Sequence, residues 1–411
     1  MIFRYFLLVI GFIAFVAPLQ AQDDESSCIG CHIEQDEPYS TPAEHFASDI
    51  HATVGLSCEN CHGGNPEAWD YDEAKADEAG FIGVPEGLET VEMCGTCHSN
   101  PNYMRTYNPN LPTDQVAKYW TSSHGISLKK GDQAVADCAS CHNTHRIHRV
   151  TDPGSAVYHA NVSATCATCH ADKALMSKYG LDASIPEHYA GSVHGEALLV
   201  RGDAAAPTCN NCHGNHGAIP PDTGSLTDVC GLCHVNNKIL FSSSIMGKAF
   251  EDQDLHSCMV CHTAHDIQKP SDAMLALQPG TSCSGCHVEG DPGALALLAI
   301  RTTLDSLNDK IETAKGAIQT AESRGMEVEE PLIDMQTART SQIQTRTMVH
   351  SFNSARVDEE AKAGFELSEK VIKDIDELFR DFRMRKIGLG IATIFITFLA
   401  LILYLYIKTL D

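Results

Sequence analysis

Nine copies of the pentapeptide Cys-x-x-Cys-His occur in the sequence, and together they contain all 18 of its cysteines. They lie at residues 28–32, 58–62, 94–98, 138–142, 166–170, 209–213, 230–234, 258–262 and 283–287. This motif attaches c-type haem, because both thiols can bond to the same porphyrin. The histidine follows the first cysteine by about one helical turn and is therefore placed as the proximal ligand of the iron. The motifs predict about nine covalently bound haem c groups.

The residues predicted to bind this cofactor are the motif cysteines: Cys28, Cys31, Cys58, Cys61, Cys94, Cys97, Cys138, Cys141, Cys166, Cys169, Cys209, Cys212, Cys230, Cys233, Cys258, Cys261, Cys283 and Cys286. The predicted proximal ligands are the motif histidines: His32, His62, His98, His142, His170, His213, His234, His262 and His287. Cysteine pairs at this spacing also bind structural zinc or form disulfide bonds. Histidine makes up only 21 of the 411 residues, yet it follows every pair. Chance does not explain this pattern, so haem attachment is preferred.

Candidate distal ligands are more numerous than the irons. Beyond the proximal histidines, the same region holds eleven more, of which ten are predicted to be distal ligands: His45, His51, His124, His145, His159, His188, His194, His216, His256 and His265. The eleventh, His148, is an alternative partner for haem propionates together with Arg146 and Arg149. Every haem could therefore be ligated by two histidines, and such an iron is closed to substrates.

Two other kinds of axial ligand are less favoured. Methionine would raise the potential of a haem that it ligated, but histidine is in surplus, so packing is the expected role of Met93, Met104, Met176, Met246, Met259 and Met274. His350 stands alone in a helical segment far from the motifs. It could fold back to a haem, but the sequence favours an ordinary, half-exposed helix residue.

The haem region repeats internally with a unit of two motifs. A histidine precedes the second, fourth, sixth and eighth motifs, at His51, His124, His194 and His256. Three of these motifs also have a histidine three residues after the proximal one, at His145, His216 and His265. The segments 45–51, 118–124 and 188–194 resemble one another as well. Such periodicity indicates an array of haem pairs.

These motifs and flanking histidines resemble multihaem c-type cytochromes of the cytochrome c3-like kind, in which Cys-x-x-Cys-His is doubled. The resemblance covers residues 28–287 and implies closely stacked porphyrins that pass electrons along a wire. The second motif departs from the pattern, because Asn65 stands where the downstream histidine would be.

The region from residue 23 to 291 is expected to be a haem-packed domain. Its motifs span 260 residues, or about 29 per haem, which is too few to build an ordinary core. The predicted fold class is mainly α with irregular loops and little strand, and the porphyrins supply the core. A helical stalk and one transmembrane helix are expected to follow.

The stalk is predicted over residues 292–386, which contain no cysteine. Apolar residues recur at helical spacing at Leu295, Leu298, Ile300, Leu304, Leu307 and Ile311. We expect a turn at 322–331, a second helix at 332–352 and a third from 357 through 386, forming an antiparallel stalk or hairpin.

Both ends of the chain indicate export and anchoring. Residues 1–22 form a secretory signal pattern, with an uncleaved anchor as the alternative. Residues 387–407 are 21 residues without a charge, roughly 32 Å of helix, which matches the bilayer core. Residues 408–411 form a short tail.

The charges beside this segment conflict with export. Four basic residues precede it and one follows it, at Arg380, Arg383, Arg385, Lys386 and Lys408. The positive-inside rule alone would place the haem domain in the cytoplasm, but large exported domains translocate largely regardless of such charges. The predicted location is therefore the periplasmic side of the cytoplasmic membrane, with a single pass through the C-terminal helix.

The expected function is electron transport in anaerobic respiration, from a membrane quinol-oxidising partner to periplasmic or outer-membrane acceptors. The donor would be a quinol dehydrogenase or a b-type cytochrome. A formal charge of −25 suits basic redox partners and argues against nucleic acid. The chain has no recognisable flavin or nucleotide signature.

The alternative is a multihaem oxidoreductase that acts on a small nitrogen compound at one open haem, similar to hydroxylamine oxidoreductase or nitrite reductase. The CxxCK motif typical of pentahaem nitrite reductases is absent. Tyr103, Arg105, Tyr107 and His159 are candidates for lining an open site. A third reading is a membrane-bound docking subunit.

Overall fold

The computed structural model describes residues 26–221 and 226–409. The predicted signal segment, residues 1–22, lies outside them. The chain divides into two compact units. The first comprises the described residues up to Asn161 together with His216–Ala218, and the second comprises Val162–Asn215 and the chain from Ile219 onward.

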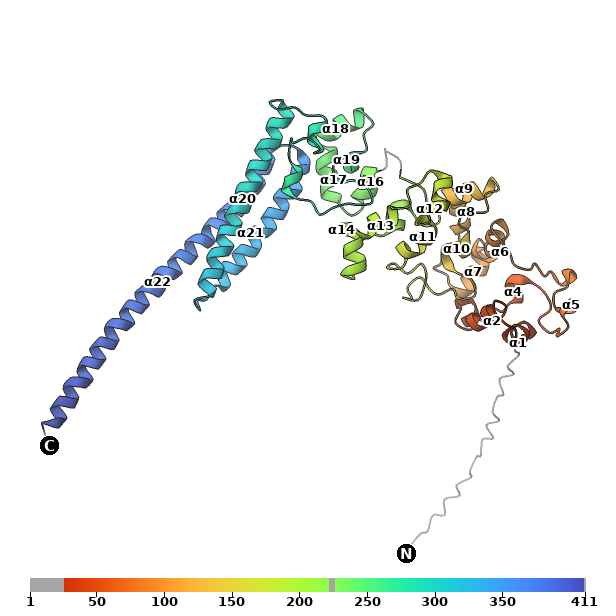
Figure 1. The fold of residues 1–411 in the computed structure, drawn as a ribbon, viewed down its shortest axis with the longest axis horizontal. Helices are drawn as coiled ribbons and strands as arrows, with labels where there is room; N and C mark the ends of the chain where they lie inside the picture. The colour runs from red at the N-terminus through yellow and green to blue at the C-terminus, as the bar shows by residue number, and fades with distance from the viewer. Residues whose placement is uncertain (1–25, 222–225, 410–411) are drawn as a thin grey trace, which may run out of the picture. The chain divides into compact units, whose positions relative to one another are not determined.

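The first unit consists of short helices joined by loops (Figure 1). They are α1 (Ser27–Ile33), α2 (Thr41–Phe46), α3 (Ile50–Thr53), α4 (Glu59–His62), α5 (Tyr71–Ala74), the 3-10 turn η1 (Asp77–Ala79), α6 (Leu88–His98), α7 (Pro101–Tyr107), α8 (Gln115–Tyr119), α9 (Ser123–Lys129) and α10 (Cys138–His142). Its apolar core is small, as in the cluster of Val91, Tyr119 and Leu128. This is expected where porphyrins are to fill the interior.

The second unit begins in the same style. Its short elements are α11 (Val162–His170), α12 (Lys173–Tyr179), α13 (Ile185–Ala190), α14 (Val193–Gly195), the π-turn η2 (Glu196–Val200), α15 (Cys209–His213), α16 (Leu226–Gly231), α17 (Val235–Ser242), α18 (Ile245–Asp252), α19 (Ser257–His262), η3 (Asp272–Met274) and η4 (Cys283–Gly285). The part of the chain that the structure describes contains no strand. The predicted mainly α fold is confirmed.

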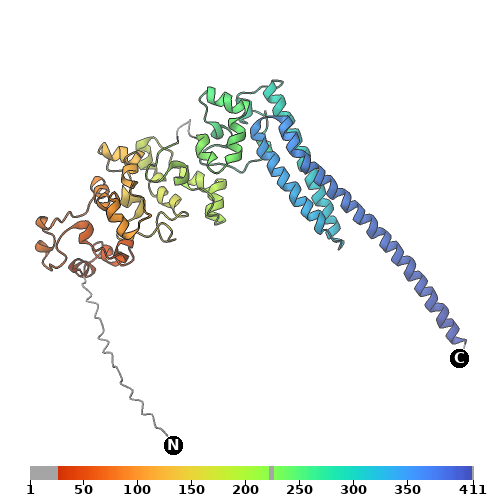
Figure 2. The ribbon, with the colours of Figure 1, turned by 180° about the vertical axis from the view of Figure 1, so that it is seen from behind.

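Three long helices complete the second unit: α20 (Pro292–Glu322), α21 (Glu329–Met348) and α22 (Ser354–Lys408), with the turn η5 (Val349–Ser351) before α22. They pack side by side, and α22 continues past the other two (Figures 1 and 2). The largest apolar cluster lies between them and includes Leu307, Ile311 and Val371. Gly364 of α22 allows close packing, because a Cβ there would lie only 3.0 Å from Leu307.

The helix ends differ slightly from the sequence-based boundaries. Asp291 caps α20 by accepting a hydrogen bond from the Ala294 amide at 2.6 Å. The turn before α21 is shorter than expected, because Glu329 and Glu330 already belong to its first turn, where acidic side chains are favourable. The η5 turn and Phe352, whose φ is 49°, separate α21 from α22.

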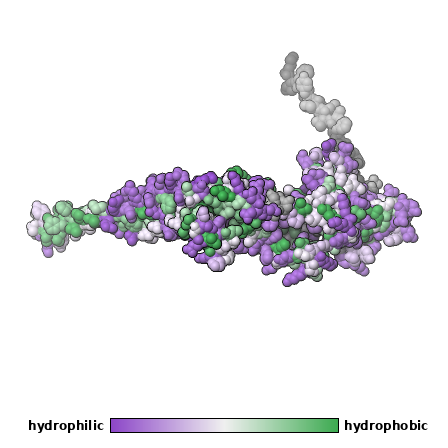
Figure 3. Space-filling model, turned by 90° about the horizontal axis from the view of Figure 1, so that it is seen from above, coloured by the Kyte–Doolittle hydropathy of each residue, from purple (hydrophilic) through white to green (hydrophobic). Residues whose placement is uncertain are grey.

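The last part of α22 suggests a membrane anchor. Within it, an 18-residue window has a mean hydropathy of 2.4 and is entirely unburied. This is the one helix among the described residues that is long and apolar enough to cross a bilayer. In Figure 3 the apolar residues gather at the end of this helix, while polar residues dominate the surface of the helical bundle.

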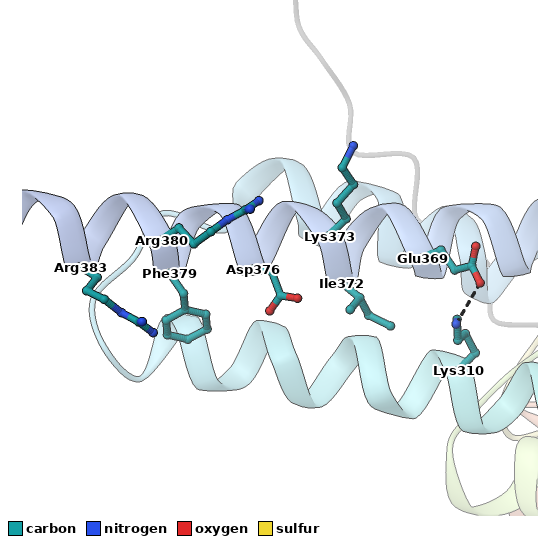
Figure 4. A pocket seen from close by; sticks show the side chains of 8 residues that line it. All are labelled: Lys310, Glu369, Ile372, Lys373, Asp376, Phe379, Arg380 and Arg383. Atoms are coloured by element: carbon teal, nitrogen blue, oxygen red, sulfur yellow. Dashed lines mark ion pairs between the residues drawn. The ribbon is translucent and has the colours of Figure 1, made fainter.

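A cavity of about 460 Å³ lies between α20 and α22. Lys310 and Glu369 form an ion pair of 2.9 Å at one end, and Phe379, Arg380 and Arg383 lie at the other (Figure 4). Neither histidine nor cysteine lines the cavity. It is therefore a feature of the helical bundle rather than a haem site.

Candidate haem centres

The Cys-x-x-Cys-His motifs lie on short helices or turns. Six helices, α4, α6, α10, α11, α15 and α19, end at the motif histidine. The start of α10 shows the local reason, because Asp137 accepts a hydrogen bond from the Ser140 amide at 2.9 Å and caps the helix. One helical turn then brings both thiols and the histidine to one side.

The cysteines are arranged for attachment rather than for cross-linking. The described cysteines form no disulfide bond. The described residues hold no group of three or more His, Cys, Asp or Glu side chains that could bind a metal ion together. Thiols of consecutive motifs lie within hydrogen-bonding distance at Cys94 and Cys138 in the first unit, and at Cys230 and Cys258 in the second. Porphyrins attached to these motifs would be neighbours.

The described residues include six histidine pairs, each of which contains one proximal histidine. In the first unit the ring-centre distances are 6.1 Å for His51–His98, 5.8 Å for His62–His145 and 6.1 Å for His142–His216. In the second they are 6.3 Å for His194–His234, 5.9 Å for His213–His265 and 6.2 Å for His262–His350. Two imidazoles that bind one metal ion from opposite sides, at roughly 2 Å each, have ring centres about 6 Å apart. All six pairs therefore fit an iron between the rings.

The pairs follow two rules. The histidine that precedes an even-numbered motif faces the proximal histidine of the next motif, as His51 faces His98 and His194 faces His234. The histidine that follows an even-numbered motif faces the proximal histidine two motifs earlier. His145 thus reaches the second motif, His216 the fourth and His265 the sixth.

Hydrogen bonds fix the orientation of several imidazoles. Nδ1 of His62 lies 2.8 Å from the Gly83 carbonyl oxygen, and Nδ1 of His51 lies 2.8 Å from the Asp49 carboxylate. Nδ1 of His32 lies 2.9 Å from the Tyr39 carbonyl oxygen. A partner on Nδ1 leaves Nε2 for the metal, which is the usual arrangement around ligating histidines.

Burial lowers the pKa of many of these imidazoles, because the charged form loses hydration. The affected members of the pairs are His98, His142, His145, His194, His216, His262, His265 and His350. The neutral imidazole is the form that binds a metal. The environment therefore favours the ligating state.

The remaining predicted ligands are less well defined. His45 lies near His145, and His188 lies near His265, since each lowers the pKa of its neighbour. His124 is half-buried in the first turn of α9, and His159 is half-buried in the first unit. Their roles as ligands stay predictions.

The sequence also offered His148 as a partner for haem propionates, and Tyr103, Arg105 and Tyr107 on α7 as candidates for lining an open site. His148 Nδ1 lies 3.8 Å from the Asp152 carboxylate. The hydroxyl groups of Tyr103 and Tyr107 are 3.4 Å apart on α7, and Arg105 is exposed. None of these residues lines the cavity between α20 and α22 or the larger cavity beside His287.

A hydrogen-bonded serine–glycine turn positions the histidines that precede the fourth and sixth motifs. Ser192 donates a hydrogen bond to the Tyr189 carbonyl at 2.7 Å and accepts one from the Gly195 amide at 3.1 Å, so that His194 is held between them. Ser122 and Gly125 form the same turn around His124.

The fourth repeat differs from the sequence-based alignment. Ser244 makes the same two bonds, to Phe241 at 2.7 Å and from Gly247 at 2.9 Å. The residue in the ligand position is therefore Met246. His256, which the sequence grouped with His51, His124 and His194, is instead exposed at the N-cap of α19.

His350 is a candidate ligand, although the sequence favoured an ordinary, half-exposed helix residue at this position. The structure brings it to His262, and it is not exposed. One signal was present in the sequence. The histidines that follow the fourth, sixth and eighth motifs face the second, fourth and sixth motifs, so the eighth motif needs a donor from beyond the array.

The helical fold, the motif helices and the histidine pairs define a multihaem c-type cytochrome. Family models agree: one described as cytochrome c3 matches residues 50–171, and one described as class III cytochrome c family matches residues 192–289. These two matched segments support a multihaem c-type cytochrome, and both families imply covalently bound haem c.

The curated relatives include the C-type polyheme cytochrome OmcB from two strains of Geobacter sulfurreducens. Each is 24% identical to this chain over 216 residues, which is 51% of this chain and 25% of OmcB. The chain thus spans about a quarter of the length of these relatives. No solved structure matches it.

The Asp49 carboxylate positions a ligand and yields a pH prediction. It accepts hydrogen bonds from both the amide and Nδ1 of His51, and from the Ile147 amide at 2.6 Å. Burial alone would raise its pKa, but these bonds lower the pKa overall. The carboxylate therefore stabilises the fold above its unfolded pKa of about 3.9, and this stability is lost as the pH falls through the lower folded pKa.

Asp49→Ala is expected to cost about 1–3 kcal/mol of unfolding free energy at neutral pH, because three partly buried donors lose their acceptor. The cost should shrink below about pH 4. Denaturant unfolding at several pH values, followed by absorption of the holoprotein, measures both. A cost that stays constant down to pH 2 would contradict this role.

Proposed function

We propose that this protein is a membrane-anchored periplasmic cytochrome whose nine haems relay electrons through bis-histidine centres. It would accept electrons from a membrane quinol-oxidising partner, such as a b-type cytochrome, and pass them to periplasmic or outer-membrane acceptors. The observation that carries the proposal is the set of six histidine pairs spaced for an iron. A haem supplies reversible one-electron chemistry, and two histidines leave its iron no position for a substrate.

The neighbouring motifs support a relay. Thiols of the second motif lie near those of the third, those of the sixth near the seventh, and those of the eighth near the ninth, as Cys61–Cys94, Cys212–Cys230 and Cys261–Cys283 show. Attached porphyrins would follow one another along each unit. The motif cysteines would hold neighbouring porphyrins close together, and the paired histidines would keep the irons six-coordinate.

The exposed apolar end of α22 supports the anchor, and the net charge of −25 supports basic partners. We expect the dithionite-reduced holoprotein to transfer electrons rapidly to a basic soluble cytochrome c, with a rate that falls as ionic strength rises. Stopped-flow absorption measures this rate.

The same preparation should not consume nitrite or hydroxylamine. Turnover of either compound at a rate comparable to electron transfer would overturn the relay and support an enzyme with one open haem. Electron transfer that is slow and independent of salt would also contradict the proposal.

A further inference from the structure

The turn between α21 and α22 carries a histidine that is placed like a distal ligand. The ring centres of His350 and His262 are 6.2 Å apart and their planes differ by 18°. In the three other pairs formed by even-numbered motifs, the distances are 5.8–6.1 Å and the angles 8–17°. His350 thus reproduces the geometry of that series.

From this geometry we infer that His350 is the distal axial ligand of the haem attached at Cys258 and Cys261. The inference rests on the proposed haem array, but it assigns a ligand that lies outside both matched family regions.

The tautomer of His350 fits this role. Nδ1 lies 3.0 Å from the Thr347 carbonyl oxygen, so its hydrogen can be donated there and Nε2 is left for a metal. The amide nitrogen of Asn237 is 3.3 Å from both ring nitrogens, which places it beside the ring rather than in line with either nitrogen. Burial also lowers the pKa of His350 and favours the neutral imidazole.

The order of the array explains why the ligand comes from so far along the chain. Each of the second, fourth and sixth motifs receives the histidine that follows the motif two places later. The eighth motif has no such donor, because the array ends with the ninth and that motif has Gly290 where a histidine would follow. Terminal units of repeat arrays commonly need such a cap.

Contacts around the turn hold His350 in place. Arg346 makes a bidentate ion pair with Asp272, at 3.0 and 2.7 Å. Met348 and Val349 pack in an apolar cluster with Ile300. The helices that lead to the predicted anchor are therefore attached to the eighth haem site by a ligand as well as by packing.

The test is His350→Gly in the full-length holoprotein, with the haem content, the absorption spectrum and low-temperature EPR as readouts. The thioether bonds do not involve His350, so the haem content should be unchanged. One haem per chain should become high-spin, and added imidazole should restore the low-spin state. Unchanged low-spin spectra would overturn the assignment.

Two further variants keep the test decisive. Arg346→Gln weakens the same contact with Asp272 but keeps the histidine, and it should stay fully low-spin. His350→Met should also stay low-spin, with one haem at a higher potential. Spin state reports ligation alone, whereas electron transfer to cytochrome c reports the relay, so the two proposals can fail separately.

The repeated serine–glycine turn supports a second inference, which is independent of His350. In this turn the glycine has no room for a Cβ, which would lie 2.0 Å from a carbonyl oxygen at Gly195 and 2.1 Å at Gly125 and Gly247. The three turns therefore present the residue before the glycine in the same way. That residue is histidine in two turns and Met246 in the third.

We propose that Met246 is the distal ligand of the haem attached at Cys283 and Cys286. The turn before the sixth motif serves the seventh, as His194 and His234 show. The turn before the eighth motif should likewise serve the ninth, whose first thiol lies near Cys261.

The proximal side of the ninth site is suited to a porphyrin. Nδ1 of His287 lies 3.2 Å from the Asp291 carboxylate. His287 lines a cavity of about 910 Å³, together with apolar residues that include Leu277, Leu295 and Leu298. A Cβ on Gly293 would lie 2.2 Å from the His287 ring, so a larger residue there would displace this ring.

A methionine ligand would make this haem the exception to the proposed bis-histidine ligation and give it the highest potential in the array. The oxidised holoprotein should show the long-wavelength absorption band of iron–sulfur ligation for one haem. Met246→His should remove the band and lower one potential, and Met246→Leu should produce one high-spin haem. Met259→Leu is the control and should change neither. Absence of the band, or a Met246→Leu variant that stays fully low-spin, would overturn the assignment.

Discussion

Gly195→Ala is expected to leave the seventh haem without its distal histidine. The new Cβ would lie 2.0 Å from the Tyr189 carbonyl oxygen and 2.8 Å from the Ala190 Cα. Both atoms belong to the backbone, so no side-chain movement can relieve the clash, and the turn that presents His194 must open. The expected cost is about 3–5 kcal/mol of unfolding free energy, with one haem per chain becoming high-spin.

Denaturant unfolding of the holoprotein and its absorption spectrum measure these two effects. Gly191→Ala is the matched control, because its Cβ would meet nothing closer than the Glu187 carbonyl oxygen at 3.6 Å. If Gly195→Ala were as stable as Gly191→Ala and fully low-spin, the turn would not be what positions the ligand.

His265→Met is expected to slow electron transfer through the second unit. His265 faces the proximal histidine of the sixth motif, in the middle of the array. Methionine ligation should raise the potential of that haem by on the order of 0.1 V, within the roughly 0.8 V that axial ligands span. Since 59 mV is a tenfold change for one electron, electrons would leave this site about 50-fold less readily.

Spectroelectrochemical titration measures the potential, and stopped-flow oxidation by cytochrome c measures the rate. His256→Met changes an exposed histidine at the N-cap of α19 and should alter neither. An unchanged titration curve for His265→Met would show that His265 is not a ligand.

The haem sites themselves are readable from the sequence, because attachment needs residues that are adjacent in the chain. The same is true of the three long helices, whose apolar spacing at Leu304, Leu307 and Ile311 reports one buried face. The long apolar end of α22 is likewise a local signal.

The pairing of ligands is not readable in this way, because each distal histidine comes from another part of the chain. Asp49 illustrates the difficulty: it positions His51 through a bond to Ile147, far along the sequence. His350 is likewise far along the sequence from the motif it faces. Met246 and His194 occupy equivalent positions in the same hydrogen-bonded turn. A search of the sequence for histidines cannot find this equivalence, because the residue type differs.

Low-temperature EPR combined with magnetic circular dichroism, on the oxidised full-length holoprotein of known haem content, tests the central claim most directly. We predict about nine haems per chain, all low-spin, with nitrite and hydroxylamine leaving the signals unchanged. The pair His51–His98, whose ring planes differ by 88°, should give a more anisotropic signal than the near-parallel pairs. A high-spin haem whose signal shifts with nitrite or hydroxylamine would contradict the relay and identify an open catalytic site.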